Sequence, residues 1–414
     1  MNRRCTLLLA ACLAAPFTWS QWTVLPPDAA PDSARHLLRV EGALLYNSNA
    51  ILNELPGHLL RGEDLDRELR QRSSDALAGR KRAVFGYGYH GRITWTGARL
   101  KEGRSRWRPT ASFALHEYAG ARITPDLYDL VFFGNARFEA RTAALAPAAY
   151  EQTRYNTLGI GLVDQHSRSY LRLDLVQGAS LTAVEVEWAD LYTGVDGRVL
   201  RSAVLASYLN SDTAGNDRAR NNGLGAALSG RWETPIRAAA RPTHLSVAVE
   251  DLGFVRWNDN SVRLDRDTVV SFEGLAVDNV LDLDAILIGE DQLLDTLGLR
   301  YRTGARTRLL PFRAQVAYRI EGRGGWHFAL AAQYQHLPSY LPQVTASVGR
   351  NTGEHFSWGA SVSLGGHGGF LVGAGGRYRL ARRITVEASV PQLIGFAGGR
   401  TRGLGALLAI QVAL

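Results

Sequence analysis

Hydrophobic and polar residues alternate with a period of two along most of the chain. Over residues 403–414, leucine, alanine, isoleucine and valine occupy one face and mainly glycine, alanine and glutamine the other, with Leu407 as the exception. Over residues 83–97, aromatic and aliphatic side chains alternate with glycine, histidine and arginine. Successive side chains of a strand point to opposite faces, so this pattern predicts β-strands. Further strands are predicted over residues 155–163, 169–177, 184–192, 199–209, 224–232, 245–251, 308–318, 326–335, 344–348, 356–364, 370–378 and 384–390.

The composition of the two faces indicates where these strands lie. One face carries bulky apolar side chains, whereas the other carries glycine, serine, histidine and glutamine, which would form a poor core in a soluble β-sandwich. Strands of about ten residues also suit a bilayer better than the five or six usual in soluble sheets. In lipid a sheet must close on itself, because no backbone group can stay unpaired. We therefore predict an all-β, closed antiparallel transmembrane barrel with short helical segments, with a soluble sandwich as the alternative.

The N-terminus has the pattern of a secretory signal. Two arginines precede an apolar run over residues 7–15, and small residues follow near Ser20, so we expect removal of residues 1–20. A lipoprotein signal that acylates Cys12 is the alternative. Because both cysteines and the only methionine precede Ser20, the exported chain would lack a disulfide, a thiolate metal site and a cysteine nucleophile. No later apolar run approaches the ~20 residues of a membrane helix, so we predict an integral protein of the Gram-negative outer membrane.

Several segments do not follow the strand pattern. Residues 21–80 begin rich in proline, and residues 63–77 within them have the charge and leucine spacing of a short helix. We expect residues 21–80 to form an N-terminal plug or a periplasmic lead-in, with a solvated loop as the alternative, and residues 81–414 to form the barrel. Residues 126–133 do not suit a strand either. The acidic, leucine-rich residues 277–297 would suit an amphipathic helix at the rim or in the lumen.

A seven-residue motif begins at Asp251 and reads Asp-Leu-Gly-Phe-Val-Arg-Trp. We interpret it first as structural: Asp251 ends a strand, and Gly253 permits a bend or bulge. Phe254 and Trp257 would anchor at a membrane interface. Arg256 would pair with Asp251 or with a lipid headgroup. The functional alternative is that the motif shapes a lateral opening or a ligand pocket, and the sequence does not separate the two.

At this motif the chain resembles a family of Gram-negative outer-membrane barrels known only as a domain of unknown function. The resemblance continues through residues 272–275 and through Leu310 and Pro311, and it covers most of the chain. The family is similar in plan to the long-chain fatty-acid transporter fold, which implies about fourteen strands and an N-terminal plug. The Asn-Pro-Ala element usual near the mature N-terminus of the family is absent here, and residue 414 is leucine rather than an aromatic residue. The resemblance implies no particular substrate, because the family has no assigned activity.

Charge and residue spacing exclude several classes of function. The formal net charge is +8 and is carried almost entirely by scattered arginines, so nucleic-acid binding is not expected. His244 and Ser246 share one strand face at a spacing like that in outer-membrane phospholipase, but polar lining of a lumen is the favoured interpretation. The histidines show no metal-ligand spacing, and the glycine-rich turn near residue 367 precedes a strand rather than a helix. We therefore predict no metal, no cofactor and no enzymatic activity.

Inward-facing polar residues are the candidate lumen lining, namely His90, Arg92, His327 and Gln333. Inward glycines leave room beside them, at Gly86, Gly88, Gly373 and Gly375. This room favours passage of small hydrophobic molecules, which the transporter-like plan also implies. The alternative function is a structural, assembly or secretion-associated scaffold, whose lumen would be filled. The expected partners are outer-membrane lipid, the barrel-assembly machinery and a small hydrophobic ligand, and the sequence specifies no protein partner beyond these.

Overall fold

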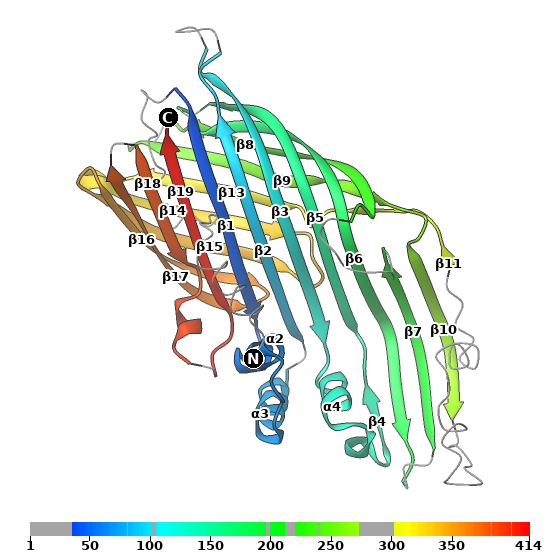
Figure 1. Ribbon diagram of the computed structural model, residues 1–414. Coiled ribbons are helices and arrows are strands. Elements are labelled where there is room, and N and C mark those ends of the chain that lie inside the picture. The colour runs from blue at the N-terminus through cyan, green and yellow to red at the C-terminus, as the bar shows by residue number, and fades with distance from the viewer. Residues whose placement is uncertain are drawn as a thin grey trace.

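Fourteen antiparallel strands close into one barrel in the computed structural model of the protein (Figure 1). The structure describes residues 35–80, 82–100, 105–164, 166–195, 199–211, 220–237, 241–272, 302–381, 383–398 and 400–414. The barrel strands, in their order around the wall, are β1 (Leu37–Ser48), β2 (Ala83–Thr96), β3 (Trp107–Ile123), β5 (Ala148–Asp164), β6 (Ser169–Thr193), β8 (Gly223–Pro235), β9 (Thr243–Trp257), β13 (Arg313–Glu321), β14 (Trp326–Gln335), β15 (Leu341–Thr352), β16 (Phe356–Gly366), β17 (Gly369–Ala381), β18 (Ile384–Val390) and β19 (Leu404–Ala413). The other strands are β4 (Arg141–Ala144), β7 (Leu200–Asn210), β10 (Val262–Phe272), β11 (Arg302–Thr303) and β12 (Arg306–Leu309). The prediction of an all-β, closed antiparallel barrel is confirmed.

Strand β1 closes the barrel. It pairs with β2 along its whole length and with β19 along most of it. The plug or lead-in expected over residues 21–80 is therefore corrected in part, because β1 belongs to the wall. The alternation of β1 was hard to recognise because Arg39 and Glu41 face the interior, where Glu41 lies opposite Arg92 of β2. Residues 1–34, with the expected signal, and the expected helix over residues 277–297 lie outside the described residues.

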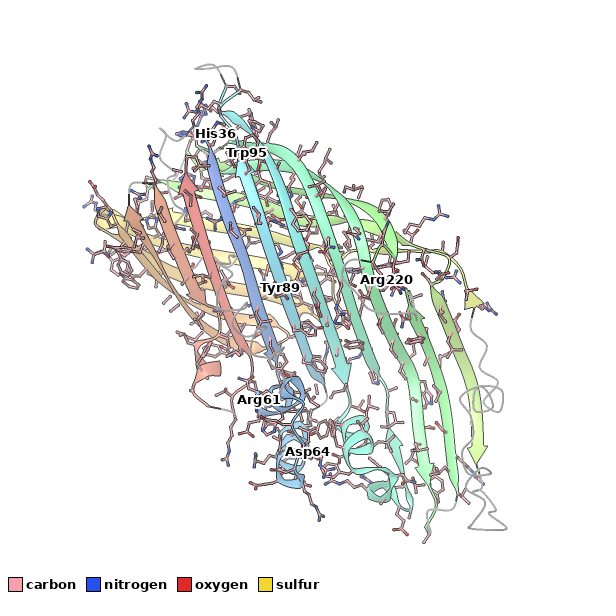
Figure 2. All side chains as sticks on the ribbon, viewed as in Figure 1. His36, Arg61, Asp64, Tyr89, Trp95 and Arg220 are labelled. Atoms are coloured by element: carbon pink, nitrogen blue, oxygen red, sulfur yellow. The ribbon has the colours of Figure 1, made fainter. Side chains whose placement is uncertain are left out.

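The outward faces of the barrel strands form an apolar belt. Exposed aliphatic and aromatic side chains cover it, including Phe113, Ile160 and Leu173. At the end with the short turns, Trp95 stacks on His36 with ring centroids 5.8 Å apart (Figure 2). Aromatic residues at the edge of an apolar band are typical of a β-barrel at a membrane interface. The protein is thus an integral barrel of the outer membrane.

A polar cluster marks the other edge of the belt. Tyr87 Oη donates to Glu117 Oε1 at 2.8 Å, and Gln152 Nε2 donates to the same oxygen at 2.9 Å. Arg154 Nε lies 3.1 Å from this oxygen. Strand alternation puts Glu117 on the same outer face as Phe113. A carboxylate is costly in the hydrocarbon core of the bilayer. We therefore place the lipid headgroups at the level of Glu117.

Beyond the belt, one side of the wall continues as an extension, which comprises the end of β6, β7 and β10. Strand β6 has 25 residues; it pairs with β8 as far as Gly178, and from Thr182 onward it pairs with β7. Strand β7 then pairs with β10. The sequence predicted two strands here, over residues 169–177 and 184–192, because the small residues between them resemble a turn. They form one strand, since that stretch stays paired with β5 across a bulge.

The helices lie in the long connections at the end opposite the short turns (Figure 1). They are α2 (Glu54–Arg61), α3 (Arg67–Leu77) and α4 (Pro125–Phe133). Short 3-10 turns are η1 (Asn135–Phe138) and η3 (Leu393–Phe396) at the same end and η2 (Arg323–Gly325) at the other. Helix α3 begins after Asp66, whose side chain accepts a hydrogen bond from the amide of Leu69 at 2.7 Å. Leu55, Leu77 and Tyr128 join the three helices in a small apolar cluster.

The helix predicted over residues 63–77 is confirmed as α3, and residues 126–133, which did not suit a strand, lie in α4. No described helix is long and apolar enough to cross a bilayer. Connections at the opposite end of the barrel are short, such as residues 322–325 and 353–355. Short turns of outer-membrane barrels face the periplasm, so we assign the helical end to the cell exterior.

Deletion of residues 1–80 should prevent barrel formation, whereas deletion of residues 1–34 should not. Loss of β1 leaves the facing edges of β2 and β19 unpaired in lipid. After refolding in detergent micelles, only the shorter deletion should keep the heat-modifiable gel mobility of a closed barrel. A folded barrel without β1 would contradict the closure described here.

Candidate functional site

The Asp251 motif lies inside β9, where it forms a β-bulge. The pairing register between β8 and β9 slips at Ser229, which faces both Glu250 and Asp251. Asp251 has a φ of 55°, and its amide donates to Ser229 Oγ at 3.0 Å. The bulge turns both carboxylates into the barrel, where Glu250 is 8% exposed and Asp251 4%. Asp251 therefore does not end its strand, as the sequence suggested, because β9 continues to Trp257.

Beyond the bulge the motif alternates again, but with its phase changed. Phe254 is exposed on the lipid face, whereas Trp257 is buried inside the barrel at 1% exposure. Trp257 packs over Gly178, where an added Cβ would lie 2.7 Å from the indole ring. It is thus not the interface anchor that the sequence suggested. Arg256 shares the outer face of Phe254, so it faces away from Asp251 and does not pair with it.

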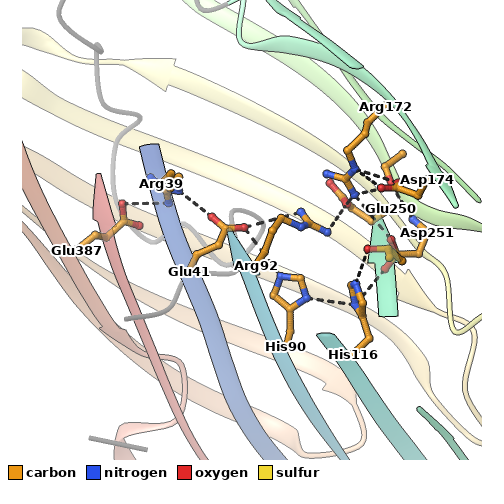
Figure 3. A network of polar contacts seen from close by, with 12 residues as sticks. Arg39, Glu41, His90, Arg92, His116, Arg172, Asp174, Glu250, Asp251 and Glu387 are labelled. Atoms are coloured by element: carbon orange, nitrogen blue, oxygen red, sulfur yellow. Dashed lines mark hydrogen bonds and ion pairs between the residues drawn. The ribbon is translucent and has the colours of Figure 1, made fainter. Parts of the chain in front are cut away.

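A network of ion pairs crosses the interior at the level of the bulge (Figure 3). Arg92 of β2 lies 3.5 Å from Glu250 Oε2 of β9, and Arg172 of β6 lies 3.4 Å from the same oxygen. Arg172 Nε also lies 2.8 Å from Asp174, and Arg92 Nη1 lies 3.8 Å from Glu41 of β1. All five side chains are buried. Since β2 and β9 are not neighbours in the wall, these contacts span part of the lumen.

A second branch of the network joins Asp251 to two histidines and a tyrosine. Tyr155 Oη donates to Asp251 Oδ2 at 3.0 Å, and His116 Nδ1 lies 3.5 Å from the same oxygen. The His116 ring stacks on Tyr155 with centroids 4.4 Å apart. His90 Nδ1 lies 3.2 Å from His116 Nδ1, so one ring donates and the other accepts. Both histidines therefore act as part of the packed network.

An apolar layer lies between the network and the outer end of the barrel. Its buried side chains come from separate strands and loops and include Tyr118, Trp257 and Leu337. Leu337 belongs to the loop over residues 336–340, between β14 and β15. This loop folds into the barrel as far as β3, because an added Cβ on Gly120 would lie 3.2 Å from Leu337 Cβ. The loop is therefore part of the packed interior.

Polar side chains close the interior beside this loop. Gln333 Nε2 donates to Tyr340 Oη at 2.8 Å and to Gln343 Oε1 at 2.9 Å. Burial raises the pKa of Tyr340 to about 12, so its hydroxyl keeps its proton at neutral pH. His367 Nε2 lies 3.0 Å from Pro338 O, and burial lowers the pKa of His367 to about 4. We call this set the outer layer; it comprises Gln333, Tyr340, Gln343, His367 and the loop over residues 336–340.

The wall from β14 to β17, which we call the small-residue wall, has a different lining from the network. Strand alternation and pairing turn small, uncharged side chains inward, and several of them are only half-buried: Ala329, Ala331, Thr345, Ser347 and Ser361. The network contacts come mainly from β1 to β9. The interior therefore has a charged half, in which ion pairs hold the side chains, and an uncharged half with small and partly accessible ones.

The inward glycines leave less room than the sequence suggested. An added Cβ on Gly86 would collide with the ring of His367, which occupies that space. An added Cβ on Gly373 would lie 3.2 Å from the backbone of Pro391, in the connection before β19. Residues from the outer connections thus fill space that these glycines open. Alternation of residue types could not reveal this filling, because the connections come from distant parts of the chain.

The predicted lining residues separate into different parts of the interior. His90 and Arg92 belong to the network, and Gln333 belongs to the outer layer. His327 lies at the short-turn end, where its Nε2 is 3.1 Å from Asn351 Nδ2. Glu250 was not among the predicted lining residues, although alternation with Ser246 turns it inward, because its partners Arg92 and Arg172 lie far from it in the chain.

The structure gives no catalytic arrangement at the histidine and serine weighed from the sequence. His244 Nδ1 lies 3.7 Å from Glu233, and His244 Nε2 lies 3.6 Å from Glu321. Within the described residues, no hydrogen bond joins His244 to Ser246. In the same part of the chain, no group of three or more metal-ligating side chains is close enough to hold an ion.

Comparisons with known proteins identify a family and find distant likenesses among solved structures. A family model described as "Family of unknown function (DUF5723)" matches residues 62–383. Among solved structures, the P. putida toluene transporter TodX has a TM-score of 0.44 at 9% identity and covers 97% of this chain and 96% of its own. The Ralstonia pickettii toluene transporter TbuX has a TM-score of 0.40 at 7% identity, over 93% of this chain and 91% of its own. The translocator domain of the autotransporter NalP from Neisseria meningitidis has a TM-score of 0.33 at 8% identity, over 94% and 91%.

No match was found among curated proteins. Likeness of this degree to the solved structures assigns neither a substrate nor an activity.

Substitution Glu250→Gln should lower the free energy of unfolding by about 3–5 kcal/mol, because Arg92 and Arg172 lose their shared carboxylate while they stay buried. Urea unfolding of the barrel in lipid vesicles, followed by tryptophan fluorescence, would measure the change. The matched control is Asp265→Asn on the extension, where an exposed pair with Arg263 is worth at most about 1 kcal/mol. Equal effects of the two substitutions would show that the network does not support the barrel.

Proposed function

We propose that this chain, which belongs to the family of unknown function DUF5723, is an outer-membrane barrel that lets small uncharged molecules, hydrophobic ones included, pass through a gated interior. The observation that carries the proposal is the small-residue wall from β14 to β17. Apart from the arginines of β17, its inward side chains are uncharged, and several are partly accessible; they face a network whose charges pair with one another. A solute that keeps to this wall need not break an ion pair.

The side chains that line the small-residue wall also favour an uncharged solute over an ion. Alanine, threonine and serine offer few hydrogen bonds and no charge, so an ion that left water here would lose hydration without a partner. An uncharged or hydrophobic molecule has no such cost. The one buried arginine on β17, Arg377, is paired with Glu387 of β18 at 2.9 Å. Charge along this half is therefore neutralised within the wall.

In this proposal, the outer layer is the gate of the passage. A cavity of about 20 Å³ lies among its residues, room for about one water molecule. We propose that the contacts of this layer close the passage at this level and that it opens when the loop over residues 336–340 moves outward. The loop is held by neutral hydrogen bonds and by Arg82, whose Nη2 donates to Ser339 O at 3.2 Å.

A structural, assembly or secretion-associated scaffold is the second candidate. Two observations favour it: the network fixes the charged half of the lumen, and the extension stands beyond the lipid headgroups where partners could reach it. For either function we propose contact with outer-membrane lipid and insertion by the barrel-assembly machinery. The two candidates differ in whether the outer layer ever opens.

The double substitution Leu337→Gly and Tyr340→Ala should open the barrel. It removes one apolar and one hydrogen-bonded member of the outer layer, and planar-bilayer recordings should then show conducting events that the unaltered protein rarely shows. Liposome swelling should be faster with uncharged solutes than with anionic ones of equal size. Leu341→Ala, at an exposed neighbour on the lipid face, is the control and should stay closed. A double variant that stays closed would favour the scaffold.

Acid should also open the outer layer, through His367. Burial holds the pKa of His367 at about 4, whereas in water its pKa is about 6.5. The closed layer therefore keeps its full stability above about pH 6.5 and loses about 1.4 kcal/mol per pH unit as the pH falls toward 4. Open probability should rise over this window, and His367→Gln should remove the rise. The same acid response in that variant would assign the effect to another group.

A further inference from the structure

The outer mouth holds a groove that the proposed passage does not require. Its volume is about 950 Å³, which is in the range of small-molecule sites. The inner face of the extension lines one side, and β12 with the loop over residues 336–340 lines the other. The charged and titratable side chains that bear on its chemistry are Arg122, Glu151, Glu185, Glu187, Arg306, Arg308 and His336.

Part of this charge is already paired within the groove. Arg308 Nη2 lies 3.6 Å from Glu151 Oε2, which joins β12 to β5 across the groove. Burial, with a smaller contribution from Arg308, lowers the pKa of His336, so His336 is neutral at pH 7. The charge of Arg308 is thus balanced within the groove, whereas the charges of Arg122 and Arg306 are not.

Two arginines and two glutamates of the lining have no ion pair among the described residues. Within the described chain, Arg122 and Arg306 make no side-chain hydrogen bond or ion pair, and the Nε atom of each is shielded from solvent. Glu185 and Glu187 are exposed on the groove wall and, in the same part of the chain, also have no ion pair. An Nε–H group that is shielded from water without an acceptor is costly, and a bound oxyanion would remove that cost.

The spacing of these charges suggests the length of a ligand. Arg122 of β3 pairs with Ala149 of β5, and Ala149 pairs with Glu185 of β6. The two residues therefore stand at one level of the sheet, two strand spacings or about 10 Å apart. An extended tripeptide spans roughly 10 Å between its charged ends. Its carboxylate can reach an arginine while its ammonium group reaches the glutamate.

We propose that this groove binds a small zwitterion of about tripeptide length, with its carboxylate at Arg122 and Arg306 and its ammonium group at Glu185. The loop over residues 336–340 lines one side of the groove, but the three binding side chains are not members of the outer layer, and binding can be tested whether or not the barrel conducts. This goes beyond the proposed passage, because it gives the exterior mouth a recognition function of its own.

Triglycine is the probe, titrated calorimetrically into the full mature chain in detergent micelles. Binding should weaken by roughly tenfold or more in Glu185→Gln and in Arg122→Gln, because each loses one charge-assisted contact. Arg306→Gln serves as the second arginine variant if Arg122→Gln does not fold. The matched control is Arg263→Gln, since Arg263 lines the same groove but is paired with Asp265 at 2.8 Å, and its affinity should stay unchanged.

An uncharged, blocked probe and a dianionic probe of similar length decide the ligand class. Acetyl-triglycine amide and glutarate should each bind roughly tenfold or more weakly than triglycine. Glutarate that binds as tightly would reduce the groove to a plain anion site and overturn the proposal. Equal binding of the blocked peptide, unchanged affinity in both charge variants, or no heat with triglycine up to about 10 mM would overturn it as well.

Discussion

Every backbone donor and acceptor at membrane depth must find its partner within the sheet, and β1 meets this requirement for the barrel. Its place between β2 and β19 leaves no edge in lipid and fixes the number of strands. A barrel of eight strands is filled by its own side chains, whereas one of sixteen to eighteen encloses water. This barrel lies between these sizes. Its interior is therefore occupied by long paired side chains on one half and by a loop that folds in from the outer end.

The bulge at Asp251 connects the wall to that interior. A regular strand would turn only one of two consecutive carboxylates inward, but the positive φ of Asp251 turns both. Glu250 then pairs with Arg92 and Arg172, while Asp251 accepts a hydrogen bond from Tyr155 and lies beside His116. The bulge also shifts the phase of the strand, so that Trp257 packs inside. One local irregularity thus supplies the charges of the network and a large side chain of the apolar layer.

The sequence predicted the barrel class because alternation of apolar and polar residues is a local signal, and most of the strands were found on that basis. It failed where interior chemistry breaks the alternation. Strand β3 was missed because His116 and Tyr118 face inward while Glu117 faces outward, which reverses the usual polarity. The two carboxylates at the bulge were not recognised as partners of the arginines, since Arg92 and Glu250 are 158 residues apart. No local pattern encodes such a contact.

The two halves of the interior differ in what it would cost to open them. Contacts of the network are charge-assisted and buried. Moving one side chain therefore leaves its partner as an unpaired buried charge, which costs about 3–5 kcal/mol for each broken pair. The outer layer on the other half is held by neutral amide, hydroxyl and imidazole groups, and each such hydrogen bond contributes only about 1 kcal/mol. Among the described residues, motion of the loop over residues 336–340 breaks hydrogen bonds of this kind and the contact from Arg82, and it exposes Leu337. Any opening of the barrel should therefore follow the small-residue wall and leave the charged half intact.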